Sequence, residues 1–340
     1  MLKFQTLVVA GLVALSAAAA ALGQTTLISN TGTRAISVAN ARIYYSDPTA
    51  EFCTSQRSRS MSVSGGIPTD MVTVQFCPFN SAIKADGAYV FAGSLQTIDR
   101  FWSGGPSADV ETIATPSIGN DVFYRIETQG DWVYWQASAA IGRVRRDGTD
   151  PIQIPRAPTF RTGLAAASNG YVYWSEGNEG AGIIKRADLG APAPVTVTGG
   201  TLNSPATLAT DANFVFWSET NGAIKRASLT PGGSPITLRA AVAGGYTVNS
   251  LVVDTTHVYW LESTGPGVGR IFRVPIGGGT PTQVGPGNLS SASNLQQDTD
   301  NLYWIETANG NIFRMAKDAA AIRPDFSWIG LEATQGIQNI

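Results

Sequence analysis

The sequence has little charge and almost no histidine. Only 14% of its 340 residues are Asp, Glu, Lys or Arg, against about 25% in an ordinary soluble domain. The 23 basic and 25 acidic residues give a formal net charge of −2, so the chain lacks the concentrated Lys and Arg surface that binds nucleic-acid phosphates. The single histidine excludes three-His and His₂Glu zinc sites and paired-His iron sites within one chain. Because basic residues are few and balanced by acidic ones, we expect no nucleic-acid partner.

The N-terminal segment has the features of a signal peptide. Lys3 supplies a positive charge, residues 7–21 form an apolar run, and small residues precede position 24. We expect cleavage after Gly23, so that residues 1–23 are removed and the protein is secreted, extracellular or periplasmic; an uncleaved N-terminal anchor is the alternative. No other segment is long and apolar enough to cross a bilayer, so we expect no membrane insertion after cleavage.

Cysteine is also scarce, with Cys53 and Cys77 as the two copies in the chain. In an oxidising compartment two cysteines are more often bonded than free, so we predict a disulfide between them. Such a disulfide would stabilise the folded state by about 3 to 4 kcal/mol, because it restricts the unfolded chain. The alternative, a reactive thiol, lacks the nearby histidine or basic helix end that would lower its pKa.

Aromatic residues, in contrast, are frequent and periodic. Seven copies of an aliphatic–aromatic pattern follow one another at intervals of about 40 to 45 residues, the length of a four-stranded propeller blade. The last aromatic residues of the copies are Tyr45, Phe91, Trp135, Trp174, Trp217, Trp260 and Trp304. Short turn sequences such as Asn40-Ala41 and Asn169-Gly170 precede them, which indicates tight hairpins.

A second repeated element follows the aromatic one. In six copies a basic residue comes two positions after an aliphatic residue, and a Gly- and Pro-rich turn with a short β-branched strand ends the unit. The arginines are Arg100, Arg146, Arg186, Arg226, Arg273 and Arg314. We predict an all-β propeller, with seven four-stranded blades, over residues 24–317.

The two ends of this region complement each other. The last unit lacks an outer strand after Lys317, and the segment Thr26-Leu27-Ile28 has no inner-strand partner of its own. Because an unpaired sheet edge would otherwise remain, we expect the N-terminal strand to close the ring. Residues 318–340 then form a C-terminal tail or the start of a further domain.

The repeats also carry a family resemblance. The segments are Tyr173-Trp174-Ser175-Glu176, Phe216-Trp217-Ser218-Glu219, Tyr259-Trp260-Leu261-Glu262 and Tyr303-Trp304-Ile305-Glu306. They resemble the YWTD-type propellers of lipoprotein-receptor-like proteins and related bacterial exported propellers, which implies the fold more than a function. Glu in place of Asp, seven units in place of six and the lack of a Cys-rich flanking module favour the bacterial exported type. Residues 328–338 resemble the opening strand of a further domain in some large exported bacterial proteins.

Acidic residues occupy one position of the repeat. Glu176, Glu219, Glu262 and Glu306, with Asp47 in the first unit, lie two residues after the marker aromatic. A residue needed in every blade is usually part of the framework, so we interpret them as structural Glu–Arg pairs; an acidic ligand or cation surface is the alternative.

The fifth unit allows a more detailed prediction. A two-residue Asn221-Gly222 turn would place Trp217 opposite Arg226, with Glu219 diagonal to it, so that the arginine stacks on the indole and binds the carboxylate.

Residues that occur once offer little chemistry. His257 begins an aromatic strand beside a turn, no G-x-S-x-G sequence is present, and we expect a half-exposed structural histidine. Asp298-Thr299-Asp300-Asn301 could bind calcium, but the segment lacks the glycine and closing glutamate of an EF-hand loop, so we interpret it as a turn and expect no cofactor.

These observations favour an exported, monomeric, non-enzymatic propeller that binds a protein or a glycan. We expect the binding surface on the loops that follow the aromatic strands, including Glu179, residues 264–267 and the loop around Cys53, because these loops vary most between units. The alternative is an exported propeller lyase or hydrolase that uses acidic residues and a divalent metal at the central channel.

Overall fold

The structure is a computed structural model. It describes residues 24–28, 35–48, 56–74, 82–93, 97–106, 109–115, 123, 125–137, 140–155, 163–177, 180–188, 193–265, 268–308 and 310–318. Residues 1–23, both cysteines, Glu179 and residues 319–340 lie outside this range, so the predictions of a signal peptide, a disulfide and a further domain stay predictions. Within the part of the chain that the structure describes, no helix is long and apolar enough to cross a membrane.

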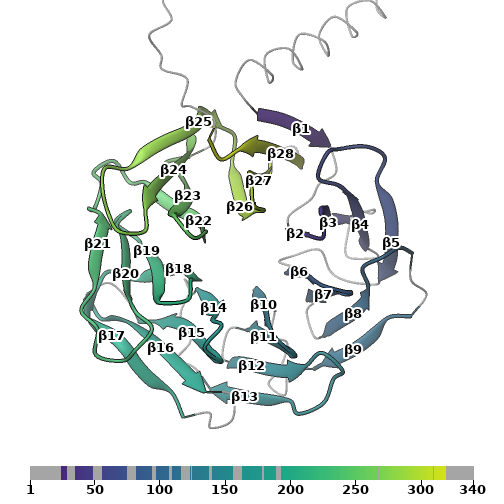
Figure 1. The fold of residues 1–340 in the computed structure, drawn as a ribbon, viewed down its shortest axis with the longest axis horizontal. Helices are drawn as coiled ribbons and strands as arrows, with labels where there is room; N and C mark the ends of the chain where they lie inside the picture. Colours follow the sequence, from purple (N-terminus) through teal and green to yellow (C-terminus); the bar gives the residue numbers. More distant parts are fainter. Residues whose placement is uncertain are drawn as a thin grey trace, which may run out of the picture.

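Seven four-stranded antiparallel sheets stand around a central axis (Figure 1), which confirms the predicted propeller. We number the blades along the chain and name the strands of each blade from the axis outwards. The first three blades are formed by β2 (Ile36–Ala39), β3 (Arg42–Pro48), β4 (Gln56–Ser62) and β5 (Thr69–Val74); by β6 (Ile83–Asp86), β7 (Tyr89–Gly93), β8 (Ile98–Trp102) and β9 (Glu111–Ala114); and by β10 (Arg125–Gln129), β11 (Trp132–Gln136), β12 (Ala140–Arg145) and β13 (Ile152–Pro155).

The next three blades follow the same order. They are formed by β14 (Leu164–Ala166), β15 (Tyr171–Glu176), β16 (Gly182–Asp188) and β17 (Val195–Leu202); by β18 (Pro205–Thr210), β19 (Phe214–Glu219), β20 (Ile224–Ser228) and β21 (Ile236–Arg239); and by β22 (Thr247–Val253), β23 (His257–Ser263), β24 (Gly269–Pro275) and β25 (Thr282–Leu289). The seventh blade has β26 (Ala292–Gln297), β27 (Asn301–Glu306) and β28 (Asn311–Ala316), with β1 (Gln24–Ile28) as its outermost strand.

The N-terminal strand closes the ring, as predicted. β1 pairs antiparallel with β28, with Gln24 opposite Met315 and Ile28 opposite Ile312, and Figure 1 shows the two strands side by side at the rim. This pairing covers the outer edge of β28.

The hydrophobic core lies between the blades. The buried apolar side chains form seven clusters in the described residues, and each cluster combines two neighbouring blades. The second strands supply the largest buried side chains. Neighbouring residues of a strand point to opposite faces, so each second strand contributes to the core on both sides of its blade. Tyr173 therefore packs against the fifth blade and Trp174 against the third, and both are 0% exposed. Burial on both faces explains why Tyr and Trp stand next to each other in the repeat.

The pairing in the fifth blade corrects one prediction. Trp217 lies opposite Lys225, and Arg226 lies opposite Phe216, one residue away from the predicted partner. The turn has three residues because Gly222 adopts a φ of +80°, and the amide of Gly222 donates to the carbonyl of Glu219 at 2.9 Å. A left-handed residue after a tight turn adds one residue to a hairpin loop and shifts the facing strand by one.

The strand pairing also corrects the assignment of repeat positions in the third and second blades. Tyr173 pairs with Arg186, whereas in the third blade Tyr134 pairs with Arg143, so Arg143 and not Arg146 is the repeated arginine there. In the second blade Phe91 pairs with Arg100. Phe91 therefore occupies the tyrosine position and Ala92 the tryptophan position.

Candidate functional site

The repeated glutamates are buried beside the tryptophans that precede them. The indole Nε1 of Trp174 donates to Glu176 at 2.7 Å, and that of Trp260 donates to Glu262 at 3.0 Å. Trp217 and Glu219 form the corresponding pair at 3.4 Å. Residues two apart on a strand share one face, which brings each indole to its carboxylate.

Each of these three carboxylates also has a cationic partner. Lys185 and Lys225 lie opposite the two tryptophans of the fourth and fifth blades, and their Nζ atoms are 2.7 Å from Glu176 and 2.8 Å from Glu219, respectively. In these blades the lysine that precedes the repeated arginine makes the ion pair, so the predicted Glu–Arg pairing is wrong there.

The sixth blade pairs its glutamate differently. Phe272 takes the lysine position and stacks on Trp260, with ring centroids 5.7 Å apart. Glu262 binds Arg239 of the neighbouring blade through both of its oxygens and Arg270 at 3.1 Å. In the seventh blade, Glu306 accepts the backbone N–H of Ser290 at 3.1 Å. The side chain of Asp47 lies outside the described residues.

The repeated arginines hold neighbouring blades together. Arg186 donates to the carbonyl of Leu229 at 2.7 Å, Arg273 to that of Lys317 at 2.8 Å and Arg314 to that of Val63 at 2.7 Å, each in the next blade around the ring.

Several of the repeated arginines, among them Arg100, Arg186 and Arg226, also stack on the first side chain of the second strand in their own blade. The guanidinium of Arg186 lies 4.0 Å from the ring centroid of Tyr171, and that of Arg226 lies 4.1 Å from that of Phe214. These contacts place the repeated arginines in the framework.

His257 occupies the corresponding first position of β23 in the sixth blade. Its Nδ1 lies 2.8 Å from the hydroxyl of Thr256, and its ring lies beside Tyr259. Burial, and then the positive charge of Arg273, lower the pKa of His257 below its usual value, which favours the neutral ring at physiological pH.

Asp298, in the turn before β27, accepts hydrogen bonds on both of its carboxylate oxygens. Asp298 accepts the amides of Asp300 at 2.9 Å and Asn301 at 2.7 Å, and the hydroxyl of Tyr303 at 2.6 Å. Burial opposes ionisation, but these hydrogen bonds lower the pKa of Asp298. Among the residues that the structure describes, no three His, Cys, Asp or Glu side chains are grouped as a metal ion would require.

Among the residues that the structure describes, one salt bridge joins the innermost strands of two blades. Lys84 on β6 and Glu127 on β10 are 2.8 Å apart. The charge of Glu127 raises the pKa of Lys84 against the opposing effect of burial. The acidic group that β10 brings to the inside of the ring is thus paired with a lysine.

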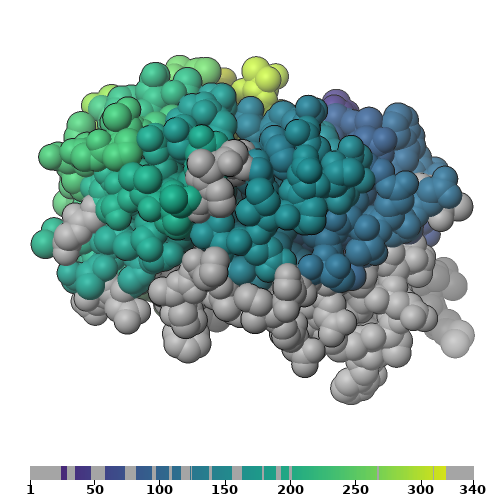
Figure 2. Space-filling model, turned by 90° about the horizontal axis from the view of Figure 1, so that it is seen from below, coloured from purple at the N-terminus to yellow at the C-terminus, as the bar shows by residue number. Residues whose placement is uncertain are grey.

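A groove of about 910 Å³ lies between the third and fourth blades. The turn at Gly130 and Asp131 forms one wall and the turn at Ser168 and Gly170 the other. These turns precede the aromatic strands β11 and β15, so the groove opens on the face opposite to the loops where we expected the binding surface. In Figure 2, which views the disc from its rim, the teal residues of these blades face the viewer.

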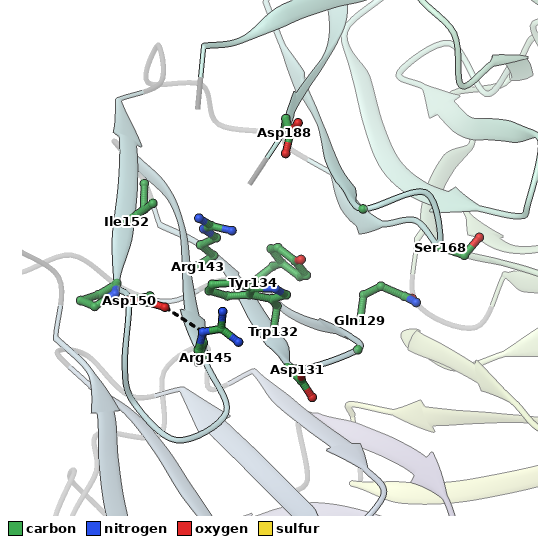
Figure 3. Close-up of a pocket in the computed structure, with 13 residues that line it drawn as sticks. Gln129, Asp131, Trp132, Tyr134, Arg143, Arg145, Asp150, Ile152, Ser168 and Asp188 are labelled. Carbon is green, nitrogen blue, oxygen red and sulfur yellow. Dashed lines mark hydrogen bonds and ion pairs between the residues drawn. The ribbon is translucent and has the colours of Figure 1, made fainter. Parts of the chain in front are cut away.

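The floor of the groove consists of aromatic and cationic side chains. The guanidinium groups of Arg143 and Arg145 lie 4.0 and 4.5 Å from the ring centroid of Trp132. Arg145 binds Asp150 at 2.7 Å (Figure 3). Arg143 is 9% exposed and makes no hydrogen bond or ion pair with a described residue. Burial lowers the pKa of Arg143.

The sequence contains only a weak signal for this groove. Trp132 is the single tryptophan at the first position of a second strand, and the shift by three residues from Arg143 to Arg146 conceals the arginine that stacks on it.

Comparisons with known proteins support the fold alone. No protein-family model matches the sequence, and no curated protein matches it. The chain is a seven-bladed β-propeller. It is similar to the WD40 propeller domain of Doa1, with a TM-score of 0.63 and 10% identity over 87% of this chain and 98% of that one.

Two further solved structures share the architecture. YCF48 bound to D1 peptide has a TM-score of 0.62 and 12% identity, over 88% of this chain and 96% of that one. A puromycin-hydrolysing peptidase of Mycobacterium tuberculosis has a TM-score of 0.61 and 13% identity, over 82% of this chain and 52% of that one. The fold thus occurs in a peptide-binding chain and within an enzyme, so function has to be argued from the site.

Proposed function

We propose that this chain is an exported, monomeric, YWTD-like propeller that acts as a binding module for a protein partner. One observation carries the proposal: a groove in a rigid framework presents a guanidinium, that of Arg143, which the described residues leave unpaired. The repeated glutamates Glu219 and Glu262, in contrast, are paired with cations inside the protein.

A protein partner suits this groove better than a neutral glycan. Sugars bind aromatic side chains by stacking on a free ring face, but the ring of Trp132 already has two guanidinium groups within 4.5 Å of its centroid. The groove offers a ligand charges and hydrogen-bond donors. YCF48, which has the same fold, is a chain that holds a peptide.

No observation on the described residues favours the alternative of a channel lyase or hydrolase. Glu127 on the innermost strand of the third blade is bound to Lys84. We therefore propose no catalytic residue in the described part of the chain.

Binding is tested with the mature chain on arrays of peptides and glycans. We expect saturable binding to a subset of peptides by the folded chain, and none by the heat-unfolded chain. A folded chain that binds no peptide or protein above background contradicts the proposed function.

Export needs a separate test. We expect an exporting host to release the full chain with Gln24 as its first residue. Retention in the cell, or a mature protein that begins at Met1, contradicts this part of the proposal.

A further inference from the structure

We propose that the groove between the third and fourth blades binds a carboxylate of a peptide segment, with the guanidinium of Arg143 as its partner. The inference rests on the proposed function, because it takes the partner to be a protein, and it adds the site and the chemical group that the site recognises.

Arg143 differs from its counterparts in other blades. Arg186, Arg273 and Arg314 occupy the same repeat position and donate to carbonyls of the next blade. Arg143 itself makes no hydrogen bond or ion pair with the described chain, although only 9% of it is exposed.

One other repeated arginine is also without a hydrogen bond to a described residue. Arg226 stacks on Phe214 at 4.1 Å, as Arg143 stacks on Trp132 at 4.0 Å. Arg226 does not line the groove. The two arginines share repeat position, stacking and charge, so Arg226 is a matched control for the groove.

The geometry points to a carboxylate. Trp132 and Tyr134 hold Arg143 on the floor of the groove, where Figure 3 shows it between Asp150 and Asp188. A guanidinium fixed on an aromatic ring presents its planar N–H groups to a carboxylate, which accepts them two at a time. The charges of Asp150 and Asp188 favour the cationic form of Arg143, but neither carboxylate bonds to it, so its N–H groups can donate to a ligand carboxylate.

Acidic residues that line the groove restrict which charged groups a ligand can carry next to its carboxylate. Asp131 and Asp188 line the groove on the third and fourth blades. Their negative charges disfavour a doubly charged phosphate and favour a ligand with a basic group near its acidic one. A peptide that carries an acidic residue near a Lys or Arg has both charges.

The test uses two sets of octapeptides and the full mature chain. The first set has blocked ends and a central Glu beside Lys, with Gln in place of Glu as its matched control. The second set has no acidic side chain but a free C-terminus, with the amidated peptides as its control. The two sets distinguish a side-chain carboxylate from a terminal one, and isothermal titration calorimetry measures the affinities.

We expect peptides with a free carboxylate to bind the wild-type chain at least about tenfold more tightly than their neutral controls. Arg143→Gln should remove this preference, and Arg143→Lys should keep part of it, because it retains the charge and loses the planar fork. Arg226→Gln should bind as the wild type does. Circular dichroism and the thermal midpoint show that each variant is folded.

Three results overturn the proposal: equal affinity for acidic and neutral peptides, equal binding by Arg143→Gln and wild type, or tighter binding of a uronate oligosaccharide than of any peptide. If peptides bind but Arg143→Gln has no effect, the site is wrong and the proposed function stands. If no peptide or protein binds the chain at all, the proposed function fails as well.

Discussion

Replacing Glu262 by Gln tests whether the repeated glutamates are framework or a ligand surface. Glu262 is 0% exposed and binds Arg239, Arg270 and the indole of Trp260. Gln retains an acceptor for the indole and removes the charge, so two largely buried arginines lose their counter-ion. Breaking a buried ion pair by removing one partner costs about 3 to 5 kcal/mol. Because the side chain of Arg270 is 26% exposed, water compensates part of this, and we expect about 3 kcal/mol.

Urea unfolding followed by tryptophan fluorescence measures this loss. In a domain of this size, about 3 kcal/mol corresponds to a fall in the thermal midpoint of roughly 6 to 12 °C. Glu111→Gln is the matched control, because Glu111 also pairs with an arginine, Arg100, but its side chain is 60% exposed. We expect the control to lose no more than about 1 kcal/mol. If Glu262→Gln loses no more than Glu111→Gln, the framework interpretation is refuted and the glutamates become candidates for ligand binding.

Three further changes should lower stability in distinct ways. Burial opposes the ionisation of Asp254, but amide and lysine hydrogen bonds lower its pKa. Its contribution to stability is therefore complete above the unfolded pKa of about 4 and falls steadily at lower pH, so urea titrations should show a clearly smaller difference in unfolding free energy between wild type and Asp254→Asn at pH 2 than at pH 7. Deleting residues 24–28 removes the strand paired with β28 and should lower the thermal midpoint by roughly 5 to 15 °C; an unchanged midpoint contradicts closure of the ring by β1. A Cβ at Gly142 would lie 1.9 Å from Trp135, whereas one at Gly105 meets nothing within 4 Å, so calorimetry should show a loss of about 1 to 3 kcal/mol for Gly142→Ala and almost none for Gly105→Ala.

The sequence predicted the ring well because each blade repeats the same local signals. Tyr173 and Trp174 are adjacent, bulky and both buried, and this pattern suits a strand that is covered on both faces. The closing strand was also predictable, since Lys317 ends the last unit without an outer strand.

The pairing within blades was less predictable, because it depends on backbone conformation. Gly222 could close a two-residue or a three-residue turn, and its positive φ decides for the longer one. The longer turn places Arg226 opposite Phe216 and not opposite Trp217, and Lys225 forms the ion pair with Glu219.

The groove could not be predicted at all from spacing. It arises where two turns of different blades face each other, and the arginine on its floor is three residues away from the one that the spacing selected. Trp132 and Arg143 meet across β11 and β12, and only the observed strand pairing brings them together.

The most direct test of the binding site is a crystal structure of the chain with its tightest-binding acidic peptide. Our account predicts a peptide carboxylate oxygen about 3 Å from the guanidinium nitrogens of Arg143, in the groove between the third and fourth blades. A peptide bound on the opposite face, or one whose carboxylates point away from Arg143, contradicts it.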